Sequence, residues 1–157
     1  MINLNDILES KAEFHLRSHH IEYELILGEG FPNLDDKTSH DYFSVFGELY
    51  GEIVDVRPLP TKVRITSKLE DELQIVCIEH NGNQLRKDIL DWLNRNIERV
   101  EKGEPTFTTP GKHGNLRAAK ILKPYGGTIR LSNIHNGEYH IQTKVEIPIP
   151  TSTHPNS

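Results

Sequence analysis

Acidic side chains recur on one side of an amphipathic stretch in the first half of the chain. The segment "GELYGEIVD" covers residues 47–55 and places Glu48, Glu52 and Asp55 four and three residues apart. On a helix this spacing brings the three carboxylates to one face. Carboxylates are hard oxygen ligands of the kind that Mg²⁺ takes, but the solvated face of an ordinary amphipathic helix has the same pattern. The spacing alone leaves both interpretations open.

A basic, glycine-containing segment stands near the other end of the chain. "TTPGKHGNLRAAK" covers residues 108–120 and contains Gly111, Lys112 and Gly114 just before a helical stretch. Backbone N–H groups at the start of a helix can hold an anion, and Lys112 adds a positive charge. A mobile surface loop followed by a solvated helix face explains the same residues. The phosphate-loop pattern G-x-x-x-x-G-K-[ST] is absent from the sequence.

The nine histidines raise the possibility of a metal site. In "HLRSHH", His15 and His19 are four residues apart, as two zinc ligands on one helix would be. No cysteine or carboxylate cluster nearby in the sequence completes such a site. His80 stands apart from the others in "EHNG", where the asparagine and glycine are an ordinary turn signal.

Composition limits the class of protein. The chain has 157 residues, enough for one domain with a core, and a formal net charge of -5 with a pI near 6.0. We therefore expect no nucleic-acid partner and no attraction to an anionic membrane. The single cysteine, Cys77, fits a reducing compartment. Because we find no bilayer-length apolar run and no signal-peptide pattern, we expect a cytoplasmic protein.

Hydrophobic periodicity predicts the elements that must position these residues. The strongest helix signal is residues 40–56, which carry Glu48 and Glu52. The other predicted helices cover residues 4–18, 85–103 and 116–123, and the predicted strands cover residues 21–28, 61–69, 72–80, 127–133 and 138–149. This order predicts an α+β fold, in which one mixed, mostly antiparallel sheet packs against helices on one face as a two-layer α/β sandwich.

The same periodicity predicts which side chains form the core. The predicted sheet-facing helix residues are Tyr42, Phe46, Leu49, Ile53, Ile89, Leu93 and Ile97. The predicted inner face of the sheet consists of Val63, Ile65, Ile75, Cys77, Ile129 and Leu131. Two adjacent glycines, Gly126 and Gly127, are expected where a helix must reverse directly into a core strand.

From about Ile21 to Pro150 the chain resembles the GHKL ATP-binding domain shared by sensor histidine kinases, gyrase, heat-shock chaperones and mismatch-repair ATPases. The segment "HGNLRAAKILKPYGGTIRLSN" is similar to the family's glycine-led helix, double-glycine turn and next strand, and "YHIQTKVEIPIP" to its closing strand. The resemblance implies an ATPase-fold domain over residues 21–150. Apolar spacing places an N-terminal helix within residues 1–20, and composition predicts a disordered tail over 151–157.

The resemblance also implies roles for particular residues. Glu48 stands where one branch of the family has its general base, and Glu52 where the family has an asparagine that helps to hold Mg²⁺. His80 stands at the position of the aspartate that accepts a hydrogen bond from the adenine amino group. Gly82 matches the first glycine after that aspartate, and Gln84 replaces the second.

The third implied subsite holds the phosphates of the nucleotide. The resemblance assigns it to Gly111, Lys112 and Gly114. "HLR" at residues 15–17 also resembles the phospho-acceptor helix of histidine kinases, but it lacks the usual acidic residue and proline. A single-chain phosphotransfer reaction is therefore not expected.

Taken together, the departures at Glu52, His80 and Gln84 predict a degenerate nucleotide site. We expect a signalling or regulatory protein that acts through contacts with a protein partner, with no cofactor and no independent enzymatic activity. One alternative is an ATP-dependent enzyme of the histidine kinase type with atypical ATP and Mg²⁺ contacts, including Glu52 as a metal ligand. The other alternative is a structural interaction module whose pocket is filled by side chains.

Overall fold

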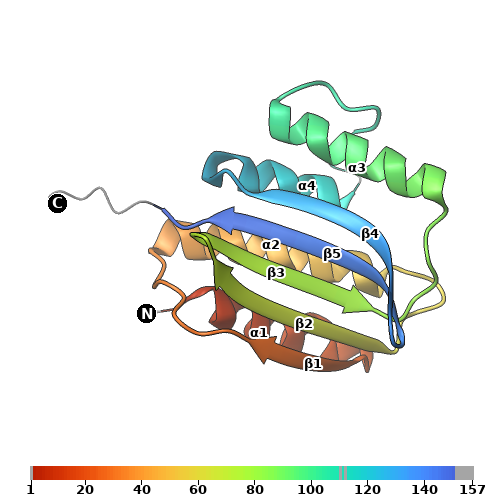
Figure 1. The fold of residues 1–157 in the computed structure, drawn as a ribbon, viewed down its shortest axis with the longest axis horizontal. Helices are drawn as coiled ribbons and strands as arrows, with labels where there is room; N and C mark the ends of the chain where they lie inside the picture. Colours follow the sequence, from red (N-terminus) through yellow and green to blue (C-terminus); the bar gives the residue numbers. More distant parts are fainter. Residues whose placement is uncertain (1, 110, 112, 151–157) are drawn as a thin grey trace, which may run out of the picture.

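One mixed sheet forms the framework of the protein. The computed structural model describes residues 2–109, 111 and 113–150, so the predicted tail over 151–157 lies outside the described residues. The strands are ordered β1-β2-β3-β5-β4 (Figure 1). β1 runs parallel to β2, and every other neighbouring pair is antiparallel. The strands are β1 (Glu22–Leu27), β2 (Lys62–Glu70), β3 (Leu73–His80), β4 (Thr128–Asn136) and β5 (Tyr139–Pro148).

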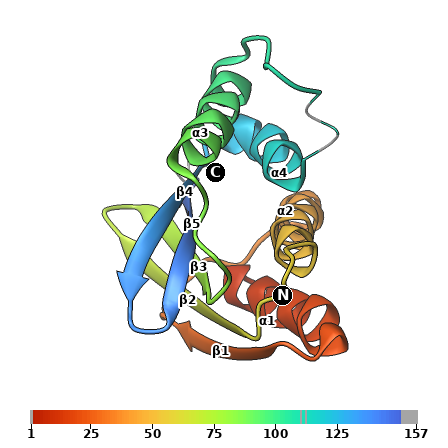
Figure 2. The ribbon, with the colours of Figure 1, turned by 90° about the vertical axis from the view of Figure 1, so that its right-hand side faces the viewer.

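The helices form a second layer beside this sheet. Figure 2 shows α1, α2 and α4 on the same side of the sheet, with α3 next to α4 and to β4. The predicted α+β sandwich is therefore confirmed. Among the described residues, no helix combines the length and the apolar character that a membrane span requires. The helices are α1 (Leu4–His15), α2 (Asp36–Val54), α3 (Lys87–Lys102) and α4 (Gly114–Leu122), with short 3-10 helices η1 (Arg17–His19) and η3 (Lys123–Tyr125).

α2 is the central helix of this layer. It begins four residues before the predicted start, because Asp35 caps its first turn by accepting a hydrogen bond from the Thr38 N–H at 2.7 Å. The predicted sheet-facing residues of this helix are buried, from Tyr42 to Ile53. The Tyr50 hydroxyl donates to the Leu8 carbonyl of α1 at 3.2 Å, so α1 and α2 share one core.

The register of β2 and β3 corrects part of the predicted sheet face. Val63 and Ile65 face the core as predicted. Ile75 pairs with Lys68, and Cys77 pairs with Thr66, so both lie on the outer face. The prediction for these two residues was wrong because β3 is buried on both faces, and alternation therefore cannot identify the inner one. Gln74, Val76, Ile78 and His80 are the inward residues of β3.

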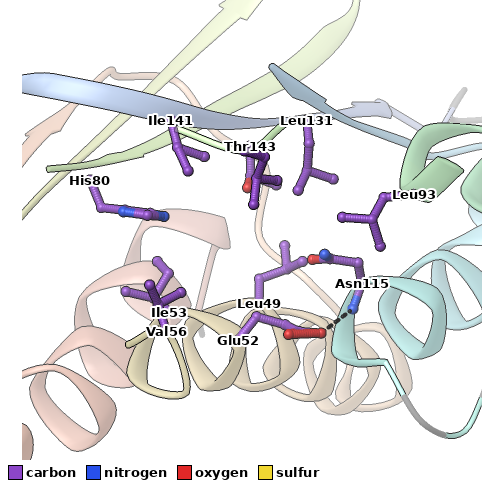
Figure 3. A pocket seen from close by; sticks show the side chains of 11 residues that line it. Leu49, Glu52, Ile53, Val56, His80, Leu93, Asn115, Leu131, Ile141 and Thr143 are labelled. Carbon is purple, nitrogen blue, oxygen red and sulfur yellow. Dashed lines mark hydrogen bonds between the residues drawn. The ribbon is translucent and has the colours of Figure 1, made fainter. Parts of the chain in front are cut away.

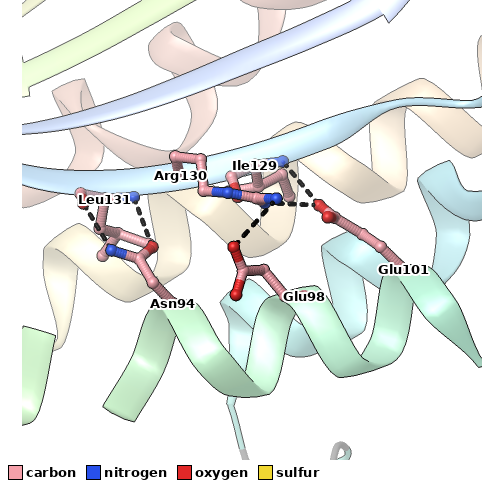
Figure 4. A network of polar contacts seen from close by, with 6 residues as sticks. All are labelled: Asn94, Glu98, Glu101, Ile129, Arg130 and Leu131. Atoms are coloured by element: carbon pink, nitrogen blue, oxygen red, sulfur yellow. Dashed lines mark hydrogen bonds and ion pairs between the residues drawn. The ribbon is translucent and has the colours of Figure 1, made fainter. Parts of the chain in front are cut away.

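α3 is fastened to the edge strand β4 by side chains. The Asn94 amide donates to the Leu131 carbonyl at 2.8 Å and accepts from the Leu131 N–H at 2.9 Å (Figure 4). Glu101 likewise accepts from the Ile129 N–H at 3.1 Å and pairs with Arg130 at 2.9 Å. These groups satisfy backbone atoms that the edge of a sheet would otherwise expose.

The packing of α3 differs from the prediction at one position. Ile97 is buried and Leu93 is partly buried, as expected, but Ile89 is 39% exposed. Ile89 lies in the first turn of α3, where the buried face of the helix passes through Leu90 instead. The prediction for Ile89 was therefore wrong.

The double glycine closes the connection from α4 to β4. Gly126 has a φ of 72°, in the left-handed region that favours glycine. At Gly127 the limit is space, because a Cβ there would lie 3.1 Å from the Cβ of Leu122. The turn brings β4 back against α4, as the sequence predicts.

Candidate functional site

A cavity of about 130 Å³ lies between α2 and the sheet, next to the first turn of α4. Figure 3 shows side chains from α2 on one side of it and from β3, β4 and β5 on the other. Most of the lining is apolar, with four polar side chains at its margins. The lining residues are Leu49, Glu52, Ile53, Val56, His80, Leu85, Leu93, Asn115, Leu131, Ile141 and Thr143.

His80 closes one end of this cavity. It is the last residue of β3 and only 5% exposed, and its ring points into the cavity (Figure 3). Nδ1 accepts a hydrogen bond from the Gly82 N–H at 3.1 Å. Burial, with a smaller effect of His140, lowers the pKa of His80 to about 4. At neutral pH the ring is therefore neutral with its proton on Nε2, and it presents a donor to the cavity.

The turn after His80 is built around Gly82. A Cβ at Gly82 would lie 2.9 Å from Nδ1 and Cε1 of His80, so only glycine permits the close approach. Asn81 fastens the turn to β2, since its side-chain oxygen accepts from the Thr61 and Lys62 N–H groups. Gln84 is exposed and donates to the Ile134 carbonyl. Of these residues, the structure brings only His80 to the cavity.

Glu52 occupies the opposite end of the cavity and is bound to the start of α4. Its Oε1 accepts from the Gly114 N–H at 2.6 Å and lies 3.4 Å from the Asn115 N–H. These N–H groups have no partner within the helix, and the positive end of the helix dipole favours a negative charge there. The carboxylate of Glu52 thus sits where the resemblance predicts phosphate contacts.

Gly114 allows α4 to approach α2 this closely. A Cβ at Gly114 would lie 2.8 Å from the Glu48 carbonyl oxygen and 2.8 Å from Cγ of Glu52. The resemblance implies that this glycine leaves room for a phosphate. In the structure, the room is taken by the backbone and side chains of α2.

Glu48 makes a second link between α2 and α4. Its carboxylate pairs with the Arg117 guanidinium at 2.7 Å, and both side chains are partly exposed. Arg117 also donates to the Gly111 carbonyl, which joins the exposed Gly111 to the same cluster. Lys112, the remaining predicted phosphate-binding residue, lies outside the described residues. Glu48 is absent from the cavity lining, so the structure separates the two predicted acidic site residues.

Sequence reasoning missed Asn115 and Thr143 as polar residues of the cavity. Asn115 follows Gly114 directly, and its place in the first turn of a glycine-led helix was a usable signal. Thr143 lies on the inward-facing side of β5, opposite Ile78 and Leu131, which only the strand register reveals.

The histidines of the N-terminal segment lie away from this cavity. The Nδ1 atom of His19 is 2.8 Å from the His15 carbonyl, and the His15 ring is in edge contact with Phe14 and Tyr50. Burial, with nearby Lys11, lowers the pKa of His15. Within the part of the chain that the structure describes, no three histidine, cysteine or acidic residues are grouped as a metal site would require.

Solved structures of other proteins have this architecture, although their sequences differ widely from that of this chain. No protein-family model and no curated protein sequence matches the chain. The mycobacterial sensor histidine kinase MprB is 14% identical with a TM-score of 0.68, covering 94% of this chain and 96% of its own. The ATP-binding domain of PrrB from Mycobacterium tuberculosis is 14% identical with a TM-score of 0.68, covering 96% of each chain.

Full-length ShkA in complex with AMPPNP is also similar, at 15% identity and a TM-score of 0.67. The match covers 94% of this chain and 30% of ShkA. At these identities the comparisons establish the fold alone. The chain has the fold of the histidine kinase ATP-binding domain, as the resemblance predicted.

Proposed function

We propose that this chain is a signalling or regulatory domain with a histidine-kinase-like ATPase fold, a degenerate nucleotide site and an output through protein contacts. The observation that carries the proposal is the hydrogen bonding of Glu52 to the Gly114 and Asn115 N–H groups. The Glu52 carboxylate thus occupies the N–H donors that a phosphate would need.

The negative charge of Glu52 also opposes the binding of a phosphate at the start of α4. A phosphate approaching the start of α4 would meet the negative charge of Glu52 before it reached the N–H groups. Two like charges about 4 Å apart repel by about 4 kcal/mol near a protein surface. The phosphate would have to displace the carboxylate or recruit a cation between them.

The opposite end of the cavity is also unsuited to adenine. The resemblance implies an acceptor that receives the adenine amino group, but His80 presents an N–H donor there. Two donors facing each other leave a buried polar group unpaired, which costs about 1–3 kcal/mol. Both ends of an adenine nucleotide therefore meet the wrong chemistry.

The enzyme alternative retains one supporting observation, which is that the cavity still exists beside α2. In that alternative Glu52 would exchange its N–H partners for Mg²⁺, since carboxylates are ordinary Mg²⁺ ligands. Glu48 would then have to leave Arg117 to act as a base. The interaction-module alternative requires the cavity to be too small for any ligand.

Calorimetric titration with Mg-ATP tests the proposal. We expect no micromolar binding to the wild type. The variant His80→Asp, Glu52→Asn, Gln84→Gly removes the reversed donor, the extra charge and the bulky turn residue. Relief of an unpaired group predicts an affinity about tenfold to a hundredfold higher.

A matched control is Asp55→Asn, which removes one charge from the exposed C-terminal end of the same helix. It should leave the affinity unchanged. Micromolar binding of Mg-ATP by the wild type would overturn the proposal and favour the enzyme alternative.

A further inference from the structure

We propose that the cavity binds a small, unphosphorylated planar heterocycle that buries a carbonyl oxygen against the Nε2–H group of His80. This site goes beyond the proposed function, which concerns the failure to hold a nucleotide. The ligand class follows from the donor at one end, the walls between, and the charge at the other end.

The donor is fixed by local geometry. Because Gly82 donates to Nδ1, that nitrogen carries no proton, and the neutral ring must carry its proton on Nε2. Nε2 has no hydrogen-bond partner among the described residues, and although the residue is only 5% exposed, this nitrogen is not one of its fully buried atoms and opens onto the cavity. An N–H that faces a mostly apolar cavity is a donor for an acceptor on a bound molecule, and a carbonyl oxygen is a common acceptor at the edge of a heterocycle.

The side chains on the two sides of the cavity favour a flat, apolar ligand. Ile141 lies on the sheet side of the His80 ring, while Ile53 and Val56 lie on the α2 side (Figure 3). A volume of about 130 Å³ is close to that of an engineered apolar cavity, about 150 Å³, that binds benzene. A six-membered ring is therefore of a size that this volume can hold, and a fused second ring would use the rest of it.

The far end of the cavity excludes phosphate. Glu52 and Asn115 lie across the cavity from His80 (Figure 3). The Glu52 carboxylate repels anions and accepts from ring N–H or amino groups. The side-chain amide of Asn115 and the hydroxyl of Thr143 make no hydrogen bond to other described residues and supply further polar contacts at the margin.

Hypoxanthine and adenine are suitable probes, because they differ in a carbonyl versus an amino group at one ring position. Adenine offers ring nitrogens in place of a carbonyl oxygen, and with N1 or N7 against the His80 N–H its amino group lies beside that donor, where it adds a second donor. Titration of the ¹⁵N-labelled protein with each free base should give saturable shifts at His80 and Thr143 for hypoxanthine. We expect adenine to bind at least about tenfold more weakly, the consequence of one unpaired buried group.

The decisive variant is His80→Asp, which replaces the donor by an acceptor. It should reverse the preference, so that adenine binds more tightly than hypoxanthine. His140→Gln is the matched control, since His140 neighbours Gly82 but does not line the cavity. It should keep the wild-type preference.

A measurement on the wild type alone tests the same contact without depending on the folding of a variant. In the wild type, hypoxanthine should move the imidazole ¹⁵N signal of Nε2 while Nδ1 keeps the shift of an unprotonated acceptor. The proposal is overturned if neither base binds, if both bind equally, or if His80→Asp keeps the wild-type order. Binding of Mg-ATP would count against the proposed function. It would not affect this test, because the preference for hypoxanthine over adenine is measured with the free bases.

Discussion

At the residue scale, three side-chain and backbone contacts decide the chemistry of the cavity. Gly82 fixes the tautomer of His80, Glu52 occupies the N–H groups at the start of α4, and Gly114 lets the two helices approach. Each contact is of an ordinary kind: a turn, a carboxylate at a helix N-terminus and a glycine at a close approach of two helices. Their common consequence is that neither end of the cavity offers what an adenine nucleotide requires.

Buried His80 should make stability depend on pH. The folded pKa, about 4, lies below the ordinary value of 6.5. The unfolded chain therefore takes up a proton first as the pH falls, so stability is full above about 6.5 and is lost between about 6.5 and 4. The total loss from this residue is about 3 kcal/mol.

Denaturant unfolding of the wild type and His80→Gln at pH 7 and pH 4 measures this contribution. The variant should lose about 3 kcal/mol less than the wild type over the interval. His135→Gln, at an exposed position, should behave as the wild type does. Equal pH dependence in the wild type and His80→Gln would show that His80 is not buried as described.

Gly114 should tolerate no side chain. In Gly114→Ala the added methyl group would meet the backbone of Glu48, which cannot move without shifting α2. We expect a loss of about 1–3 kcal/mol, as for overpacked positions. Gly111→Ala is the matched control, because apart from its chain neighbours no atom of the described residues lies within 4 Å of its Cβ position. A neutral Gly114→Ala in thermal or denaturant unfolding would contradict the close contact of α4 with α2.

At the element scale, side chains rather than backbone join the two layers at the sheet edge. The Asn94 side chain exchanges two hydrogen bonds with the Leu131 backbone, as a neighbouring strand would, and Glu101 pairs with Arg130 (Figure 4). We call these contacts between α3 and β4 the clasp. Glu48 and Glu52 join α2 to α4 in a comparable way. The Glu48 and Glu52 links hold α4, which lines part of the cavity, against α2.

Replacing Asn94 should therefore loosen α3 from β4. Asn94→Ala leaves a backbone N–H and a carbonyl of Leu131 without protein partners, at a cost of about 1–3 kcal/mol. Arg95→Ala, at the next and exposed position, should change stability by less than about 0.5 kcal/mol. Hydrogen exchange at the Leu131 amide should rise in Asn94→Ala, and unchanged exchange would disprove the clasp.

At the scale of the whole molecule, the sequence predicts the layers better than the site. The α2 periodicity and the final hairpin predict the sandwich because burial imposes periods of 3.6 and 2 on the sequence. The face of β3 was missed, since a strand buried on both sides carries no alternation. The contact of Glu52 with Gly114 joins residues 62 positions apart, so no local pattern reports it.

A phosphate titration followed by amide NMR tests the central claim, that Glu52 takes the place of a bound phosphate. In the wild type, the Gly114 and Asn115 amide signals should show no saturable shift. Glu52→Ala removes the occupying carboxylate, so the same signals should shift saturably, with a weak affinity that falls with added salt. Asp55→Asn should behave as the wild type does. Saturable shifts of Gly114 and Asn115 in the wild type would contradict the account, because they would show that the anion site is free.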